Sequence, residues 1–224
     1  MKKILLTAAT ATILASSSAY AFEDMFYVKA NGGWSKLSEV KAKAENFDYK
    51  SKSGNSAFLG LGVGYYAMDN VRADVTFDHF LNVEHKGSQN KDGANVSGKL
   101  KGDINTLMFG GFVDVMDLSV AKLFVGASAG MSHVGGKLEQ SGKDKDGKSV
   151  SVTYKAKQKY NLAYAAHVGA SAELAPGITG ELSYSYRDMG KTNKFERTEE
   201  GKTVSFDAAH YRGHHLGFGV RFDM

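Results

Sequence analysis

Residues 71–84 read Val-Arg-Ala-Asp-Val-Thr-Phe-Asp-His-Phe-Leu-Asn-Val-Glu, and apolar side chains alternate with polar ones. The apolar positions are Val71, Ala73, Val75, Phe77, Leu81 and Val83. The polar positions are Arg72, Asp74, Thr76, Asp78, Asn82 and Glu84, and only His79 and Phe80 blur the pattern. A period of two predicts a β-strand with an apolar face and a polar face.

The same alternation recurs from residue 26 to residue 222, which predicts eight strands, the first at 26–37. The connections between them alternate in length. Short turns are expected at 68–70, 116–119 and 175–177, and long polar, lysine-rich loops at 38–55, 86–99, 135–156 and 190–205. Short periplasmic turns and long extracellular loops are typical of outer-membrane barrels.

The N-terminus predicts secretion. Lys2 and Lys3 precede an apolar segment at 4–14, and Ala19-Tyr20-Ala21 forms a cleavage motif. We expect cleavage between Ala21 and Phe22, which makes 1–21 a signal peptide and 22–224 a single barrel domain. The apolar segment is shorter than the roughly 20 residues that a membrane-spanning helix needs.

Composition narrows the class of protein. The chain has no cysteine, which excludes disulfides and thiolate chemistry, and only one proline beside 26 glycines. Its net charge is +4; removal of Lys2 and Lys3 leaves 4 − 2 = +2, too weak to indicate nucleic-acid binding. The mean hydropathy of −0.30 fits barrel strands, in which apolar and polar faces average out.

These features predict an all-β fold, an eight-stranded antiparallel transmembrane β-barrel in the bacterial outer membrane with four long loops at the cell surface. Side chains fill the interior of a barrel this narrow. We expect a structural ion-pair network there, formed by Asp74, Asp114, Lys122, Glu173, Glu181 and Arg221. Lys122 and Arg221 are expected to neutralise the carboxylates, with Asp78 and Arg187 nearer the cell surface.

Catalytic, cofactor and metal sites are not expected. The seven histidines are His79, His85, His133, His167, His210, His214 and His215. His210 and His214 share one face of the last strand, but no carboxylate or cysteine stands at a metal-ligand spacing. Asp144-Lys145-Asp146-Gly147 resembles the start of a calcium loop, yet the glutamate that completes such a loop is missing.

Two strands carry a resemblance to a known group. The segments Tyr27–Trp34 and Leu216–Phe222 resemble the first and last strands of small surface barrels of the OmpX, Ail and OmpA-transmembrane type, and most of all the rickettsial surface adhesins. The last strand is similar to the signal read by the barrel-assembly machinery, although Asp223 and Met224 follow its aromatic residue. The resemblance implies binding of a host surface, matrix or serum protein through the extracellular loops.

Basic and aromatic loop residues are the candidates for that binding. They are Lys143, Lys145, Lys148, Tyr154, Lys155, Lys191, Lys194, Phe195, Arg197 and Lys202. Such loops fit acidic glycans or acidic protein segments. The alternatives are a structural barrel whose surface contacts outer-membrane lipid and lipopolysaccharide, and a small channel. A monomer is expected.

Overall fold

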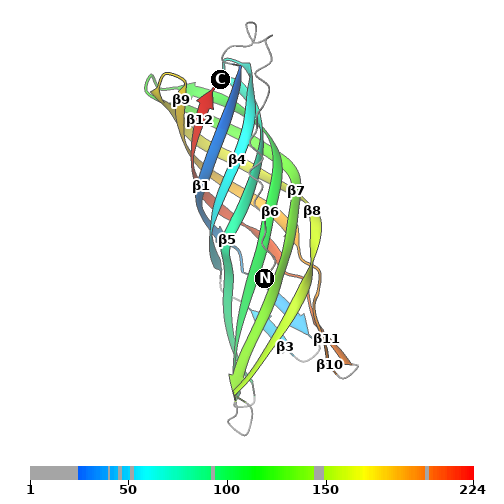
Figure 1. Ribbon diagram of the computed structural model, residues 1–224. Coiled ribbons are helices and arrows are strands. Elements are labelled where there is room, and N and C mark those ends of the chain that lie inside the picture. Colours follow the sequence, from blue (N-terminus) through cyan, green and yellow to red (C-terminus); the bar gives the residue numbers. More distant parts are fainter. Residues whose placement is uncertain are drawn as a thin grey trace, which may run out of the picture.

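The computed structural model describes residues 25–39, 41–44, 47–50, 53–91, 94–143, 149–199 and 202–224. Eight antiparallel strands form a closed ring in the order β1-β4-β5-β6-β7-β8-β9-β12, and β12 pairs back with β1 (Figure 1). They are β1 (Phe26–Leu37), β4 (Gly54–Met68), β5 (Val71–Lys91), β6 (Ala94–Asp117), β7 (Lys122–Lys143), β8 (Ser149–Ala175), β9 (Ile178–Lys191) and β12 (His210–Asp223). The prediction of an eight-stranded antiparallel barrel is confirmed.

Four short strands lie at the far end of the barrel from the C-terminus (Figure 1). β2 (Lys41–Ala44) and β3 (Phe47–Lys50) form a hairpin, as do β10 (Phe195–Glu199) and β11 (Lys202–Phe206). β10 also pairs with β8 at Ala156 and Lys155. The three short turns lie at the opposite, periplasmic end, so the four short strands belong to the extracellular side.

The outward face of the barrel is apolar around its middle. Large side chains there are exposed, with Leu61 at 69%, Phe109 at 66% and Leu162 at 73%. Aromatic pairs mark the edges of this apolar belt: Phe26 lies 5.1 Å from Tyr65, and Trp34 meets Phe218 edge-on. The described residues contain no helix long and apolar enough to cross a membrane.

A β-bulge in β5 corrects the predicted face of Val83. Phe80 pairs with Ile104 but Val83 pairs with Gly102, so two residues, Leu81 and Asn82, stand opposite one. Asn82 has a φ of 52°, the left-handed conformation that a bulge often requires. The extra residue reverses the alternation. Val83 therefore points into the barrel and is 1% exposed. His79 and Phe80, which interrupt the alternation in the sequence, lie just before this reversal.

The predicted long loops are in large part strand. β5 and β6 continue almost to the tip of their hairpin, and β7 and β8 continue through most of 135–156. These segments are rich in polar residues because their outward face contacts solvent, and not because their backbone is irregular. The four strands thus extend the barrel wall well beyond the apolar belt; we call this part, residues 84–91, 94–102, 136–143 and 149–156, the extracellular extension.

A compact apolar core fills the extracellular end of the barrel and continues onto the inner face of the extracellular extension. Its members are Leu37, Phe58, Phe80, Val83, Leu100, Ile104, Val134, Leu138, Ala156, Met189, Phe195, Phe206, Ala209 and Tyr211. The β10–β11 hairpin contributes Phe195 and Phe206, at 1% and 3% exposed. Burial of these rings fixes the hairpin over the extracellular end of the lumen.

Candidate functional site

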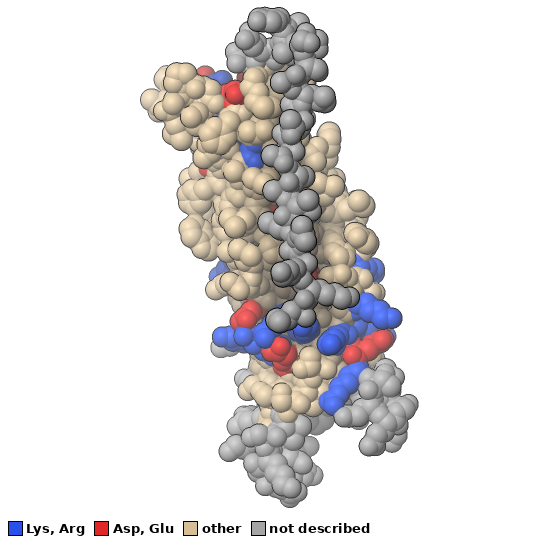
Figure 2. Space-filling model, in the orientation of Figure 1, with Lys and Arg blue, Asp and Glu red and all other residues tan. Residues whose placement is uncertain are grey.

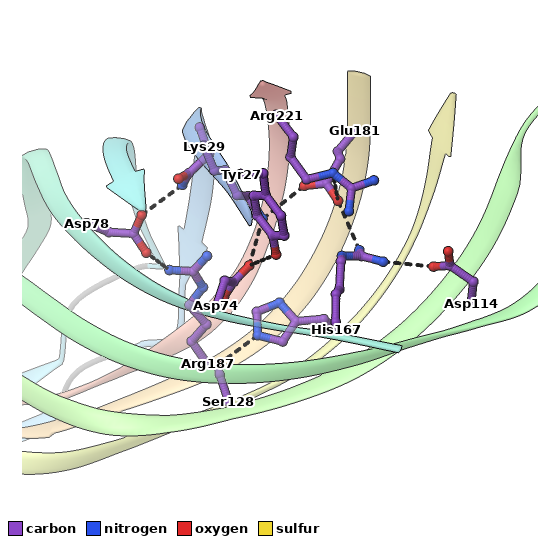
Figure 3. Close-up of polar contacts among 12 residues, drawn as sticks. Tyr27, Lys29, Asp74, Asp78, Asp114, Ser128, His167, Glu181, Arg187 and Arg221 are labelled. Atoms are coloured by element: carbon purple, nitrogen blue, oxygen red, sulfur yellow. Dashed lines mark hydrogen bonds and ion pairs between the residues drawn. The ribbon is translucent and has the colours of Figure 1, made fainter. Parts of the chain in front are cut away.

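Glu181 is the centre of an ion-pair network across the periplasmic half of the lumen (Figure 3). Its carboxylate lies 2.9 Å from Lys29 Nζ on β1, 2.9 Å from Arg72 Nη2 on β5 and 3.6 Å from Arg221 Nε on β12. The strand alternation points all four side chains inward, and the closed ring brings distant strands together.

Two further carboxylates balance the charge. Asp74 lies 3.5 Å from Lys29 and accepts a hydrogen bond from the Tyr27 hydroxyl, while Asp114 lies 2.7 Å from Arg72. With Glu181, these three carboxylates match the three cations in formal charge. A buried charge is stable only when paired and hydrogen-bonded, so this neutrality is what allows a charged interior.

A second ion pair lies nearer the cell surface. Arg187 Nη1 is 2.6 Å from Asp78, which also accepts a hydrogen bond from the Asn31 side-chain amide at 2.8 Å. Gly60 leaves the room for this pair, because a Cβ there would meet the Asp78 and Asn31 side chains. A larger residue at position 60 would displace both partners.

The network differs from the predicted one in two members. Lys122 and Glu173 are exposed at the periplasmic mouth, because Lys122 is the first residue of β7 and Glu173 lies close to the end of β8. Among the described residues, neither has an ion pair. Lys29 and Arg72 take the place of Lys122. The alternation had already placed both on the polar face, so the signal for them was present in the sequence.

Aromatic rings pack around the charges. The Arg72 guanidinium lies 4.9 Å and 4.4 Å from the ring centres of Phe112 and Phe124. A cavity of about 40 Å³ separates this layer from the Arg187–Asp78 pair, and its lining includes His167. That volume accommodates roughly a few water molecules and no larger solute.

Two serine–histidine pairs complete the lumen. Ser128 Oγ lies 2.9 Å from His167 Nε2, and Ser35 Oγ lies 2.6 Å from His215 Nδ1. The His215 ring also packs between Phe58 and Phe80 at the base of the apolar core. An open recess of about 730 Å³ lies at the periplasmic mouth. Beyond it, the polar network, the small cavity and the apolar core follow one another along the axis and close the lumen.

The outward face of the extracellular extension carries a band of charges, visible in Figure 2 beside the uncharged belt. One row crosses five adjacent strands in register: Glu84, Lys101, Lys137, Lys155 and Glu196. Diagonal ion pairs join Lys101 to Glu139 at 2.8 Å and Lys99 to Glu84 at 2.7 Å. The Lys99 ammonium lowers the pKa of Glu84, and the Glu139 carboxylate raises the pKa of Lys101.

A second basic group lies where the end of β9 meets β8. The Asn193 side chain donates a hydrogen bond to the Lys157 carbonyl at 3.3 Å, and the Asn161 side chain donates one to the Lys191 carbonyl at 3.0 Å. These bonds join the backbone of the two segments at Lys157 and Lys191. We call the four exposed lysines of these segments the β8–β9 lysine cluster. Its members are Lys157, Lys159, Lys191 and Lys194.

Comparison with known proteins found no matching family model. A Rickettsia conorii protein named "putative adhesin" is 37% identical over 251 residues, covering all of both chains. A Rickettsia bellii protein of the same name is 34% identical over 232 residues, again covering all of both chains. The chain belongs to this family of rickettsial proteins that are named putative adhesins.

Solved structures show the same fold. OprG from Pseudomonas aeruginosa covers 90% of this chain with a TM-score of 0.53 at 14% identity, and 98% of its own chain is covered. AlkL, in lipid bilayers, covers 94% of this chain and 94% of its own, with a TM-score of 0.52 at 16% identity. Both are outer-membrane barrels. The exposed apolar belt of this chain and the names of its relatives place the chain in the outer membrane as well, with its long hairpins at the cell surface.

Two of the predicted partner-binding residues of this family member pack in or against the apolar core. Phe195 is buried, and Tyr154 packs its ring 4.9 Å from Phe206, because both lie on the inward face of their strands. Lys155, Lys191 and Lys194 are exposed as expected for binding, and Arg197 is half-buried.

The remaining predicted positions lie partly or wholly outside the described residues. Lys143 and Lys202 are strand residues whose side chains are not described, and Lys145 and Lys148 lie outside the described ranges. The signal-cleavage residues Ala21 and Phe22 also lie outside them. Within the described part of the chain, no group of three or more His, Cys, Asp or Glu side chains is placed to hold a metal ion.

Proposed function

We propose that this protein is an adhesin that binds an acidic host-surface, matrix or serum macromolecule through the β8–β9 lysine cluster. The observation that carries the proposal is a set of four exposed lysines at the extracellular end, on segments that the Asn193 and Asn161 hydrogen bonds join. Basic clusters attract acidic partners and accelerate their association. The names of the rickettsial relatives support the same function.

The filled lumen argues against a channel as the main role. Solutes larger than water have no space beside the Glu181 network and the apolar core. A barrel without a dedicated ligand is the remaining alternative. It predicts that the lysines serve only solubility, so their neutralisation would leave attachment unchanged.

The test displays the barrel on a non-adherent bacterium and measures attachment to cultured host cells. The variant Lys157→Gln/Lys159→Gln/Lys191→Gln/Lys194→Gln should lose most attachment, because it removes four exposed positive charges without touching a buried group. Attachment by the unchanged barrel should also weaken as salt rises, since screening shortens from about 8 Å at physiological ionic strength to about 3 Å at 1 M.

A control variant removes two charges elsewhere, on the extracellular extension. Lys137→Gln/Lys155→Gln should attach like the unchanged barrel, and surface antibody labelling should show equal display of all variants. Full attachment by the four-lysine variant would contradict the proposal. Absence of attachment by the unchanged barrel would favour the structural alternative.

A further inference from the structure

Three lysines stand directly opposite one another on the outward face of β6, β7 and β8. Lys101 pairs in register with Lys137, and Lys137 pairs in register with Lys155. Neighbouring strands are about 4.8 Å apart, so the row spans roughly 10 Å. Like charges directly opposite on a sheet destabilise it, which makes this arrangement costly unless negative charge lies nearby.

Only one of the three lysines has a carboxylate partner on the described part of the chain. Lys101 Nζ contacts both Glu139 oxygens, at 2.9 Å and 2.8 Å. Lys137 and Lys155 are exposed, and within the described residues neither has an ion pair. Glu196 of β10 stands in register opposite Lys155, but no ion pair joins the two side chains. Within the described residues, neither ammonium group of this adjacent pair is therefore bound to a carboxylate.

Lys137 and Lys155 project outward at a height along the barrel that lies close to the membrane surface. Met131 and His133 are successive outward residues of β7, and the His133 ring stacks on Tyr160 of β8 at the edge of the apolar belt. Lys137 follows His133 by four residues, about 13 Å of strand, or roughly 10 Å in height at the usual strand tilt. The side chains project sideways from the barrel wall, toward whatever lies beside the barrel.

We propose that Lys137 and Lys155 together bind a phosphate group of a phosphorylated glycolipid in the outer leaflet next to the barrel. A phosphate between two ammonium groups accepts charge-assisted hydrogen bonds from both of them. The phosphate of an ordinary phospholipid lies within the interfacial zone about 5–7 Å thick, whereas a phosphorylated sugar headgroup extends farther outward. A macromolecule approaching from outside the cell would meet the hairpin tips before this lateral face.

The test measures binding of lipid A carrying both phosphates to the folded barrel in zwitterionic nanodiscs, with native mass spectrometry or a fluorescent lipid as the readout. Lys137→Gln/Lys155→Gln should weaken binding about 30-fold, because each lysine at an anionic lipid surface contributes roughly a five-fold factor. Lys137→Arg/Lys155→Arg should bind normally. The matched control Lys191→Gln/Lys194→Gln loses the same charge from the β8–β9 lysine cluster and should also bind normally.

Three outcomes would overturn the proposal: equal binding of lipid A from which the phosphates have been removed, equal binding of phosphatidylglycerol, or an equal loss in the Lys191/Lys194 control. The second and third would indicate a general charge effect. Heat-modified migration on cold gels verifies that every variant is folded. The result is independent of host attachment, because Lys137 and Lys155 are the control in the attachment experiment and the tested residues in the lipid experiment.

Discussion

Replacement of Glu181 by Gln is expected to lower the free energy of unfolding of the barrel by about 3–5 kcal/mol, the usual cost of leaving a buried charge unpaired. Glu181 is the shared partner of Lys29, Arg72 and Arg221, and its side chain is 3% exposed. The substitution keeps the shape of the side chain but leaves the lumen with one uncompensated positive charge. Urea unfolding in lipid vesicles, followed by gel migration and Trp34 fluorescence, measures the change.

Glu173→Gln is the matched control. It makes the same chemical change at an exposed position near the periplasmic end of β8, so the urea midpoint should not move. Equal midpoints for Glu181→Gln and the unchanged protein would show that the network does not stabilise the barrel. Destabilisation by Glu173→Gln as large as that by Glu181→Gln would show that the periplasmic mouth is as tightly coupled as the interior.

Phe195→Ala should release the β10–β11 hairpin from the extracellular core while the barrel stays folded. Truncation of a buried phenylalanine costs about 3–5 kcal/mol, and Phe195 is 1% exposed against the core that includes Phe206. Amide hydrogen exchange of β10 should accelerate by about two to three orders of magnitude, since each 1.4 kcal/mol corresponds to a factor of ten.

The control for this experiment is Lys194→Ala, which truncates the exposed neighbour of Phe195. It should leave exchange of the β10 amides unchanged. If Phe195→Ala abolished host attachment without altering exchange, Phe195 would be a partner contact after all, as its aromatic character first suggested. Loss of attachment together with fast exchange would show that the hairpin must be fixed in place for binding.

The alternation of side chains predicts the barrel because one rule, apolar outward and polar inward, applies to most of every strand. It fails at Val83, where the bulge at Leu81 and Asn82 reverses the faces. The bulge exists because two residues of β5 stand opposite one residue of β6, and the sequence of β5 alone does not show how many residues its partner has. The same limit applies where polar outward faces made the extracellular extension resemble loops.

The sequence predicts that charged residues form a network in the lumen, but it does not predict which of them pair. Inward charges are readable from the alternation, which identified Asp74, Asp114, Glu181 and Arg221. Their partners depend on the height of each residue along a tilted ring of strands, which places Lys29 and Arg72 at the level of Glu181. The burial of Phe195 and Tyr154 likewise depends on the fold of the hairpins beyond the membrane.

The central claim is that the lumen is closed, so that function belongs to the extracellular surface. Single-channel recording in planar bilayers tests it most directly. The folded barrel should show no stable conductance steps, because the Glu181 network, the Arg187–Asp78 pair and the apolar core fill the interior in succession. Long-lived, uniform conductance steps from the purified barrel would contradict the claim.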